Sequence, residues 1–429
     1  MLYPFVFTHV FNPKPVPTFG RHVPVKSSIR ARSQFAGGPL YFCMGLQKMQ
    51  NTPLDGLKVV ELARILAGPW VGQTLSDLGA DVIKVESPEG DDTRKWGPPF
   101  IDVEGERSAA YFHACNRGKR SITADFRTEE GRELVRQLVA DADVVIENFK
   151  LGGLDKYGLD YESLKATNPR LIYCSITGFG HTGPYAERAG YDFMIQGMGG
   201  IMDLTGEPDR EPQKIGVAFA DIFTGLYSVI AIQSALIMRE RTGTGQHIDM
   251  ALFDCMSAVL ANQAMNYLAS GVSPKRMGNA HPNIAPYQTL PVSDGYFIIA
   301  CGNDGQFGKL TSLLGIGDIA TDERFVSNSA RVDNRAALTA FLEEKTRAWK
   351  RDDLLAELAR IGVPAGPINT VADVFADPQF EARGMRIDPQ GVPGLRTPIR
   401  FSDAELKLDN RSPKLGEHSD AILSEIGKG

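Results

Sequence analysis

The chain has 429 residues, of which 43% are hydrophobic and 23% charged, and its formal net charge is -6 at pH 7. This length allows two domains with a large buried core, and the mild negative charge gives no reason to expect nucleic acid as a partner. The five cysteines are scattered, without a Cys-x-x-Cys pair or a cysteine–histidine cluster. That pattern argues against a disulfide framework and a structural zinc site, and it favours a reducing compartment.

The first 48 residues differ from the rest in composition. Residues 1–54 contain no Asp or Glu, and their basic side chains include Lys14, Arg21, Lys26, Arg30, Arg32 and Lys48. A basic, acid-free leader is typical of an organellar transit peptide, although four prolines before position 24 oppose its usual amphipathic helix. The alternative is an extension from a mis-assigned start, with Met44 or Met49 as the true first residue. We expect a cytoplasmic protein, or a mitochondrial one if this segment is a presequence.

Strand-like and helix-like patterns alternate from Leu57 onward. Short apolar runs typical of buried strands occupy residues 57–62, 81–86, 120–126, 143–149 and 170–180. Amphipathic helices are expected at 68–79 and 128–142, the second with Thr128 as its N-cap. This alternation predicts an α/β, Rossmann-like, doubly wound sheet whose ligands lie beyond the carboxyl ends of the strands. The G-x-G-x-x-G fingerprint is missing after the first strand, so a nicotinamide enzyme has little support.

Asp221 stands directly before a long apolar helix expected at 222–240. An ionised carboxylate in such surroundings is costly unless it is paired, hydrogen-bonded or used in chemistry. Asp221 could cap the helix, which would contribute about 1 kcal/mol to stability, or it could be a nucleophile. On the residues alone, the cap is the favoured interpretation. Thr224, Gly225 and Gln233 within the run favour a buried soluble helix, so we expect no membrane partner.

The pattern in the second half of the chain predicts a smaller unit that differs in composition and in its order of helices and strands from the first. A helix is expected at 248–269, followed by a loop at 271–288 and a strand within 294–304. The predicted organisation is a leader, a large Rossmann-like domain, linker helices with a loop, a smaller α+β domain and a tail that returns to the large domain. Their ranges are 1–48, 49–240, 241–284, 285–375 and 376–429.

Several stretches from residue 52 to the C-terminus together resemble the family III CoA-transferases. Among them are "LDGLKVVELARILAGPW", "LSDLGADVIKVESPEGDDTRKWGPPF", "NPRLIYCSITGFGHTGPY", "GVAFADIFTGLYS" and "RTGTGQHIDMALFD". These motifs are long, collinear and unusual in composition, which makes a chance match implausible. The stretches "RAGYD", "RMGNAHPNIAPYQ" and "CGNDGQF" are similar to the subgroup that acts on dicarboxylic acids.

The resemblance implies transfer of CoA from an acyl-CoA to a free carboxylic acid, with an aspartate as covalent nucleophile. The family places that aspartate in a G-x-x-x-x-D-x-x-x-G stretch, which is "GVAFADIFTG" here, so Asp221 becomes the expected nucleophile. Asp192 matches a glutamate near the family's site and is either an accessory carboxylate, with Tyr191 beside it, or a buried hydrogen-bonded acid. The resemblance also implies a homodimer of two interlocked, ring-shaped subunits, in which 49–240 binds CoA.

The resemblance further implies the residues that bind CoA. Arg127 and Lys156 match basic residues near the CoA phosphates, and Ala124 matches an adenine contact. Trp96 is a weaker candidate for the same ligand. On the sequence alone, exposed basic side chains are usually only solvated.

Candidates for the carboxylate of the substrate lie in two segments. Arg64 follows the first strand and could grip a carboxylate through two hydrogen bonds, or it could form a structural ion pair with Glu61 or Asp92. Leu66 replaces a polar residue that formyl-CoA transferase, another member of this family, uses in its site. The replacement argues against formate and oxalate as substrates. The loop "RMGNAHPNIAPY" replaces a glycine-rich family loop and supplies three weaker candidates with ordinary loop chemistry as the alternative: Arg276, His281 and Asn283.

Two other functions are open. A 2-methylacyl-CoA racemase of the same family would have a histidine at Tyr191, and a tyrosine that titrates near 10 is a poor two-way base. A non-catalytic subunit that binds CoA esters would be expected to have lost Asp221. We expect succinyl-CoA as donor and a glutarate-like acid as acceptor, with itaconate, mesaconate, malate and citramalate as alternatives. CoA thioester is then a substrate, and no metal or permanently bound cofactor is expected.

Overall fold

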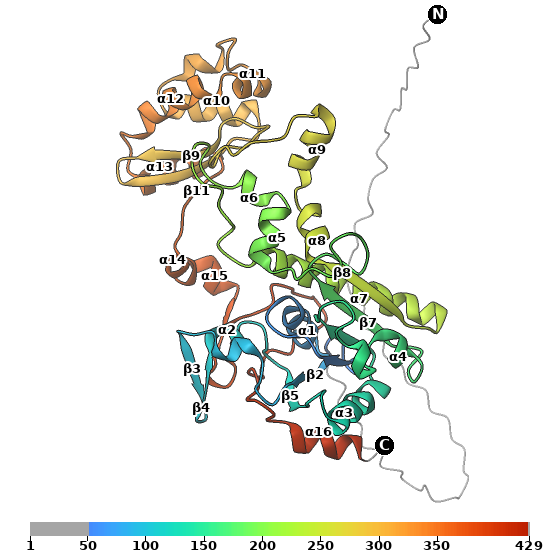
Figure 1. Ribbon diagram of the computed structural model, residues 1–429. Helices are drawn as coiled ribbons and strands as arrows, with labels where there is room; N and C mark the ends of the chain where they lie inside the picture. Colours follow the sequence, from blue (N-terminus) through green and yellow to red (C-terminus); the bar gives the residue numbers. More distant parts are fainter. Residues whose placement is uncertain (1–50, 428–429) are drawn as a thin grey trace, which may run out of the picture. The chain divides into compact units, whose positions relative to one another are not determined.

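The computed structural model describes residues 51–427 of the chain. The two interpretations of residues 1–48 concern a segment outside the described residues. The remaining sequence forms one large parallel sheet, one smaller antiparallel sheet and the helices around them (Figure 1).

A six-stranded, fully parallel sheet is the centre of the α/β architecture, with the strand order β5-β2-β1-β6-β7-β8. The strands are β1 Lys58–Glu61, β2 Asp81–Glu86, β5 Arg120–Thr123, β6 Val144–Glu147, β7 Ile172–Thr177 and β8 Gln246–Ala251. The first five lie within the predicted runs, so the parallel sheet is confirmed. The strand order reverses between β1 and β6, and such a switch point is where open α/β sheets bind ligands.

The predicted single helix at 248–269 is correct only in part. Its first residues belong to β8, which pairs with β7 along the sheet edge in a register that joins Cys174 to Ile248. The remainder forms two helices, α8 Leu252–Ala258 and α9 Ala261–Ser270, with a left-handed φ of 45° at Ala261 between them. A short apolar run fits a strand or a helix equally well, and here the ladder with β7 decides the outcome.

Helices cover both faces of the parallel sheet (Figure 1). On one face, α1 (Ala67–Asp77) and α7 (Phe219–Thr242) share a buried core with the strands. The other face is covered by α3 (Glu129–Ala140), α4 (Tyr161–Lys165) and α16 (Ser419–Ile426). The Thr128 hydroxyl accepts a hydrogen bond from the Gly131 N–H, which confirms the predicted cap of α3.

Helix α7 begins at Phe219, three residues before the predicted start, so Asp221 lies inside its first turn. By length and composition alone, α7 could cross a membrane. Its buried side packs on α1, where Gly225 approaches the Ala67 carbonyl and the Trp70 ring. The opposite side exposes Leu226, Tyr227, Ile230, Ile237 and Met238. The absence of a membrane partner stays a prediction.

The small sheet is antiparallel, with the order β11-β10-β9, and it has a hydrophobic core of its own. Its strands are β9 Tyr287–Val292, β10 Gly295–Ala300 and β11 Ala365–Pro367. The helices that pack with it are α10 Asp304–Leu313, α11 Asn328–Asp333, α12 Arg335–Thr346 and α13 Arg351–Arg360. This is an α+β unit, while the predicted domain boundaries stay predictions.

Shorter elements connect these layers. They are β3 Phe100–Val103, β4 Glu106–Ala109, α2 Ala110–His113, α5 Asp192–Met198, α6 Ile201–Leu204, α14 Val371–Phe375, α15 Pro378–Ala382, β12 Arg386–Ile387 and β13 Gly394–Leu395.

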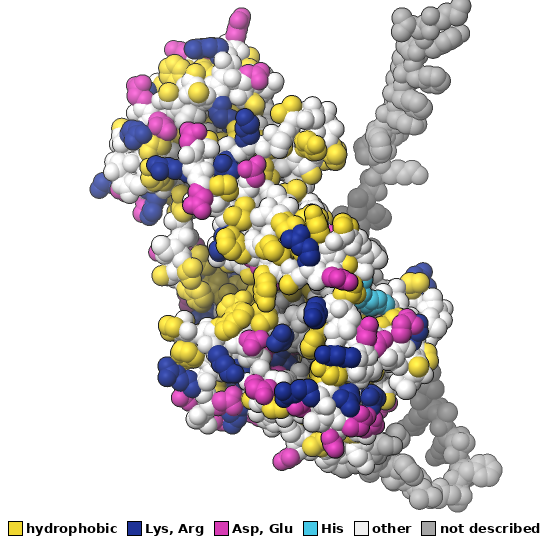
Figure 2. Space-filling model, in the orientation of Figure 1, with side chains coloured by type: hydrophobic (Ala, Val, Ile, Leu, Met, Phe, Trp, Pro, Cys, Tyr) yellow, Lys and Arg dark blue, Asp and Glu magenta, His cyan; other side chains and the backbone are white. Residues whose placement is uncertain are grey.

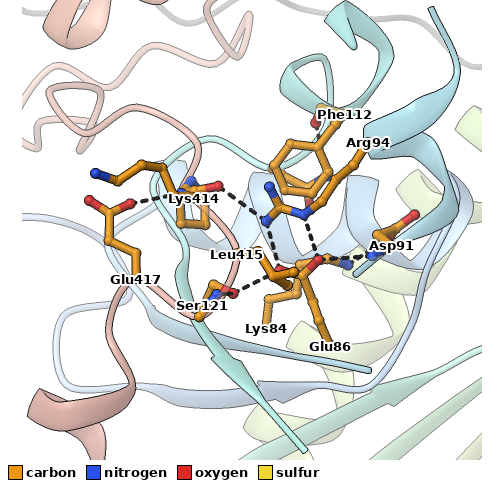
Figure 3. A network of polar contacts seen from close by, with 12 residues as sticks. Lys84, Glu86, Asp91, Arg94, Phe112, Ser121, Lys414, Leu415 and Glu417 are labelled. Atoms are coloured by element: carbon orange, nitrogen blue, oxygen red, sulfur yellow. Dashed lines mark hydrogen bonds and ion pairs between the residues drawn. The ribbon is translucent and has the colours of Figure 1, made fainter. Parts of the chain in front are cut away.

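The C-terminal tail is attached to the parallel sheet through a buried arginine (Figure 3). Arg94 makes two 2.8 Å hydrogen bonds to the Glu86 carboxylate at the end of β2 and a 3.2 Å bond to the Pro413 carbonyl. Its guanidinium lies 3.7 Å from the centre of the Phe112 ring. The Ser121 hydroxyl accepts the Gly416 N–H at 2.9 Å. These contacts bring residues 413–416 beside β2 and β5.

Removing the buried carboxylate of Glu61 is expected to destabilise the fold strongly. Its oxygens lie 3.1 Å from the Lys84 ammonium and 2.8 Å from the Lys119 ammonium, and all three side chains are buried. Because Glu61→Ala leaves two buried cations short of a partner, we expect the free energy of unfolding to fall by about 3–5 kcal/mol. Guanidinium denaturation measures this change.

Glu162→Ala is the matched control, because it breaks an exposed ion pair with Lys165. An exposed pair of this kind contributes about 1 kcal/mol or less. Equal stability of the two variants would show that the buried charges do not support the fold.

Candidate active site

Asp221 does not cap helix α7, which corrects one of the two interpretations of this residue. The N-cap position is Ala218, and no side chain at that position caps the helix. The Asp192 carboxylate takes this role from α5, since its Oδ1 accepts the Ala220 N–H at 2.8 Å and the Asp221 N–H at 3.4 Å. The side chain of Asp221 is therefore free of the capping interaction that the sequence suggested.

The environment of Asp221 disfavours its ionised form. Burial raises the pKa of Asp221 to about 7, and the negative charge of Asp192 contributes to the rise. The carboxylate consequently changes its charge near neutral pH. When ionised it is a stronger base than an ordinary aspartate, as a carboxylate nucleophile requires.

Asp192 is fixed by a fully buried glutamine. The Gln196 side-chain amide donates to Asp192 Oδ2 at 2.8 Å, and its Oε1 accepts the Ile215 N–H at 2.9 Å. Asp192 is thus a half-buried, hydrogen-bonded acid that also lies beside Asp221, and its role as an accessory carboxylate stays a prediction. The neighbouring Tyr191 is 70% exposed.

Tyr111 is a neighbour of Asp221 that the sequence analysis missed. Burial raises the pKa of Tyr111 to about 12, with the charges of Asp221 and Asp192 as further causes. The Trp96 ring packs edge-on against it, with the ring centres 5.4 Å apart. Tyr111 lies in the short helix α2 after the β3–β4 hairpin, and no motif or periodicity in the sequence marks it. Trp96 therefore lies on the Asp221 side of the site.

A cavity of about 240 Å³ opens at the carboxyl ends of β1, β2, β5 and β6. It brings together Ala124 and Arg127, two of the predicted CoA contacts, and adds the rings of Phe149 and Tyr157. The Lys156 ammonium lies 4.7 Å from the centre of the Tyr157 ring. Apolar surface beside basic groups suits a ligand with a flat heterocycle and phosphates.

Arg64 lines the same cavity. Its guanidinium forms a 3.0 Å ion pair with Asp92, one of the two partners expected for it, and both side chains are more than half exposed. Glu61, the other expected partner, is taken up by Lys84 and Lys119. Arg127 likewise pairs with Asp125 at 2.8 Å. Exposed ion pairs are weak and exchange readily, so both guanidinium groups can turn to an anionic ligand.

The three remaining candidates make local contacts. Arg276 pairs with Asp203 at 2.7 Å, while its Nε is buried without a hydrogen-bond partner among the described residues. His281 Nδ1 accepts the Asn283 N–H at 3.1 Å. No hydrogen bond within residues 51–427 joins His281 or Asn283 to Asp221 or Asp192. Their geometry favours the loop interpretation.

No group of three or more His, Cys, Asp or Glu side chains in the described part of the chain could hold a metal ion.

Comparison with known proteins identifies the family. The family model described as "CoA-transferase family III" matches residues 54–419. The "Succinate--glutarate CoA-transferase" of Agrobacterium fabrum is 61% identical over 385 residues, covering 88% of this chain and 96% of that protein. The "Acetyl-CoA:oxalate CoA-transferase" of Acetobacter aceti is 41% identical over 377 residues, covering 87% of this chain and 96% of that protein.

A solved structure agrees with these relatives. The crystal structure of a CAIB/BAIF family protein from Brucella suis is 91% identical, with a TM-score of 0.81, and covers 88% of this chain and 100% of that one. Because the family model and the relatives match along most of the chain, this protein belongs to the family III CoA-transferases and is a CoA-transferase.

Proposed function

We propose that this enzyme transfers CoA from succinyl-CoA to a glutarate-like dicarboxylic acid, with Asp221 as the covalent nucleophile. One observation carries the proposal: Asp221 lies in the first turn of α7 with its pKa raised to about 7, while Asp192 caps the helix in its place. The 61% identical relative named for succinate and glutarate supports this choice of acids.

The reaction consists of balanced exchanges of activated acyl bonds. The Asp221 carboxylate attacks the thioester carbonyl carbon, the C–S bond breaks, and CoA leaves as a thiolate beside an acyl-aspartyl anhydride. The thiolate attacks the aspartyl carbonyl of the anhydride, which gives an aspartyl-CoA thioester and releases the donor acid. The acceptor carboxylate then attacks this thioester, and the freed thiolate takes the acceptor acyl group from the second anhydride. Asp221 is regenerated without ATP or a redox reagent.

The 240 Å³ cavity would hold the adenine and phosphate end of CoA. Ala124 would contact the adenine, with Phe149 and Tyr157 offering ring surfaces beside it. Arg127 and Lys156 would bind phosphates, because basic side chains form strong charge-assisted hydrogen bonds with them. Trp96, which packs against Tyr111, would contact the reacting end of the CoA ester.

The acceptor carboxylate would be bound by an arginine. Arg276 is a candidate because its buried Nε has a free hydrogen-bond donor within the described residues. Arg64 is the other, although its place among the CoA contacts favours the CoA ester over the free acid. His281 and Asn283 would shape the loop that follows Arg276.

A 2-methylacyl-CoA racemase remains the second candidate function, but no contact favours it. Racemisation needs two acid–base groups on opposite sides of a carbon, and Tyr191 stands where the racemases have a histidine. A non-catalytic role leaves the raised pKa of Asp221 without a purpose.

We also infer a homodimer of interlocked subunits. Apolar side chains are exposed on several helices, and Figure 2 shows a concentration of them where Figure 1 places α5 and α14. They include Phe193, Met194 and Met198 of α5, Ile230 and Ile237 of α7, Met265 and Leu268 of α9, and Val371, Val374 and Phe375 of α14. Exposed apolar surface on this scale is typical of an interface with a second chain.

Asp221→Asn tests the nucleophile. The amide keeps the shape of the side chain but cannot form the anhydride, so we expect transfer to fall at least about 1,000-fold. The new CoA ester of the acceptor acid is measured by chromatography after succinyl-CoA is mixed with glutarate. Parallel reactions replace glutarate by itaconate, mesaconate, malate, citramalate, oxalate or formate.

The control is Asp254→Asn, which changes an exposed carboxylate in the first turn of α8. This variant should retain full activity. An Asp221→Asn enzyme that transfers CoA as fast as the control would rule out the covalent mechanism.

The pH dependence of kcat/KM should report the ionisation of Asp221. With a pKa of about 7, the reactive anion increases as the pH rises through 7, so activity should increase over the same range. Asp192→Asn removes the neighbouring negative charge but keeps an oxygen that can cap α7. We therefore expect its midpoint to lie at lower pH than that of the wild type. An unchanged midpoint would mean that Asp192 does not act on Asp221 electrostatically.

Ile230→Asp tests the dimer. This α7 side chain is 57% exposed in the single chain, so a charge there costs the fold little but would oppose burial against a second subunit. We expect a monomer by analytical ultracentrifugation, with transfer activity reduced. Val326→Asp, at a position 52% exposed, is the control and should sediment as the wild type does.

A further inference from the structure

The turn that follows β1 contains a strained residue. Ile65 has a φ of 74°, in the left-handed region that β-branched residues avoid. An L-residue pays about 1–2 kcal/mol for this conformation, and strained residues persist only where their surroundings fix them.

Two buried side chains hold this turn from either side of Ile65. The Asp91 carboxylate accepts the Ile65 N–H at 3.3 Å, as well as the N–H and the hydroxyl of Thr93 at 3.0 and 2.8 Å. The Lys84 ammonium donates to the Ala63 carbonyl at 2.9 Å and pairs with Asp91 at 3.0 Å. Both side chains are only 1% exposed, so this pair is not weakened by solvent.

The residue between these two contacts is held as well. The Asn148 side chain, after β6, accepts the Arg64 N–H at 3.0 Å and donates to the Arg64 carbonyl at 2.6 Å. Three successive residues, 63–65, therefore each have a backbone group bound to a side chain from another strand end. The position of the turn is fixed by these contacts, since its own conformational preference opposes it.

The turn joins the CoA cavity to the helix of the nucleophile. Arg64 lines the cavity, and α1 begins two residues beyond Ile65. The first turn of α1 lies against α7, where a Cβ built on Gly225 would stand 3.1 Å from the Ala67 carbonyl. Gly225 follows Asp221 by four residues, which is one helical turn.

We propose that Asp91, together with Lys84, is a positioning residue for the transfer reaction: it holds Ile65 left-handed and thereby sets the distance between bound CoA ester and Asp221. This inference rests on the proposed function. Lys84 and Asp91 belong to the wall of the proposed CoA cavity, but both side chains are buried and the mechanism above gives neither of them a role.

Asp91→Asn is the first test, since it removes the charge paired with Lys84 and keeps an oxygen near the Ile65 N–H. Misplacing a substrate by about 1 Å can reduce rates about 100-fold. We expect kcat for succinyl-CoA and glutarate to fall about 10- to 100-fold per folded enzyme, with little change in KM for the CoA ester. Asp160→Asn is the control, because Asp160 caps α4 in the same way but does not contact the turn. It should keep the wild-type kcat.

A rescue experiment separates positioning from general stability. Glycine adopts a positive φ without penalty, whereas alanine does not. Ile65→Gly in the Asp91→Asn background should raise kcat about fivefold or more, while Ile65→Ala in the same background should not. An unchanged kcat in Asp91→Asn, or equal effects of glycine and alanine, would overturn the proposal.

Hydrogen exchange at the Ile65 amide provides a readout that does not depend on activity. If Asp91 holds this N–H, Asp91→Asn should speed its exchange while the amides of α4 stay protected as in the wild type. Unchanged exchange at Ile65 would also contradict the proposal. A different outcome would separate the two proposals. If the wild-type enzyme transfers no CoA but Asp91→Asn still speeds exchange at Ile65, the proposed function is refuted and the role of Asp91 in holding the turn is kept.

Discussion

The capping of α7 by a residue from another helix is the interaction on which the site depends. A helix N-terminus carries free N–H groups and a partial positive charge, and an aspartate nearby usually binds to them. Here Asp192 meets that need from α5, held by the buried Gln196. Asp221 thus lies in the first turn of α7, and its side-chain oxygens do not accept the capping hydrogen bonds. Repulsion from Asp192 further raises its pKa. In the proposed mechanism, capping by Asp192 leaves the Asp221 carboxylate available as the nucleophile.

Buried charged side chains also hold segments together at the carboxyl ends of the strands. Lys84, Glu86 and Asp91 are buried there with partners at hydrogen-bonding distance. Glu86 anchors the tail through Arg94 (Figure 3). Lys84 and Asp91 bind the turn before α1 through the Ala63 carbonyl and the Ile65 N–H. These groups tie segments that are far apart in sequence to the carboxyl ends of β1, β2 and β5. The cavity proposed to hold CoA opens at these strand ends, where Arg64 and Arg127 have exposed guanidinium groups.

Sequence reasoning reached the parallel core because its periodic signals are local. Runs such as 81–86 and the Thr128 cap need no distant contact to be recognised. It failed where a distant partner decides the outcome. Strand β8 forms because it can pair with β7 along the edge of the sheet. Asp192 caps α7 although it lies 28 residues before Ala220 in the chain. Tyr111 could not be found by pattern, since a lone aromatic residue gains its meaning only from the carboxylates that the fold places beside it. The residues alone favoured a capping role for Asp221, which the structure contradicts, while the nucleophile role suggested by the family motif stays a proposal.

The buried acids of this fold have pKa shifts in both directions, set by the partners that each carboxylate has. Despite burial, the pKa of Asp91 and that of Glu86 are lowered by Lys84, Arg94 and hydrogen bonds, so their ionisation stabilises the native state above the unfolded pKa. For Asp221 the sign is opposite: the folded state binds the proton more tightly, so stability is lost as the pH rises from about 4 toward 7. Burial also raises the pKa of Glu147 to about 7, although two hydrogen bonds to its carboxylate oppose this rise. Asp221 differs from Glu147 because no hydrogen bond to its carboxylate within the described residues opposes the rise, while the nearby Asp192 adds to it; the proposed nucleophilic role would explain this destabilising arrangement.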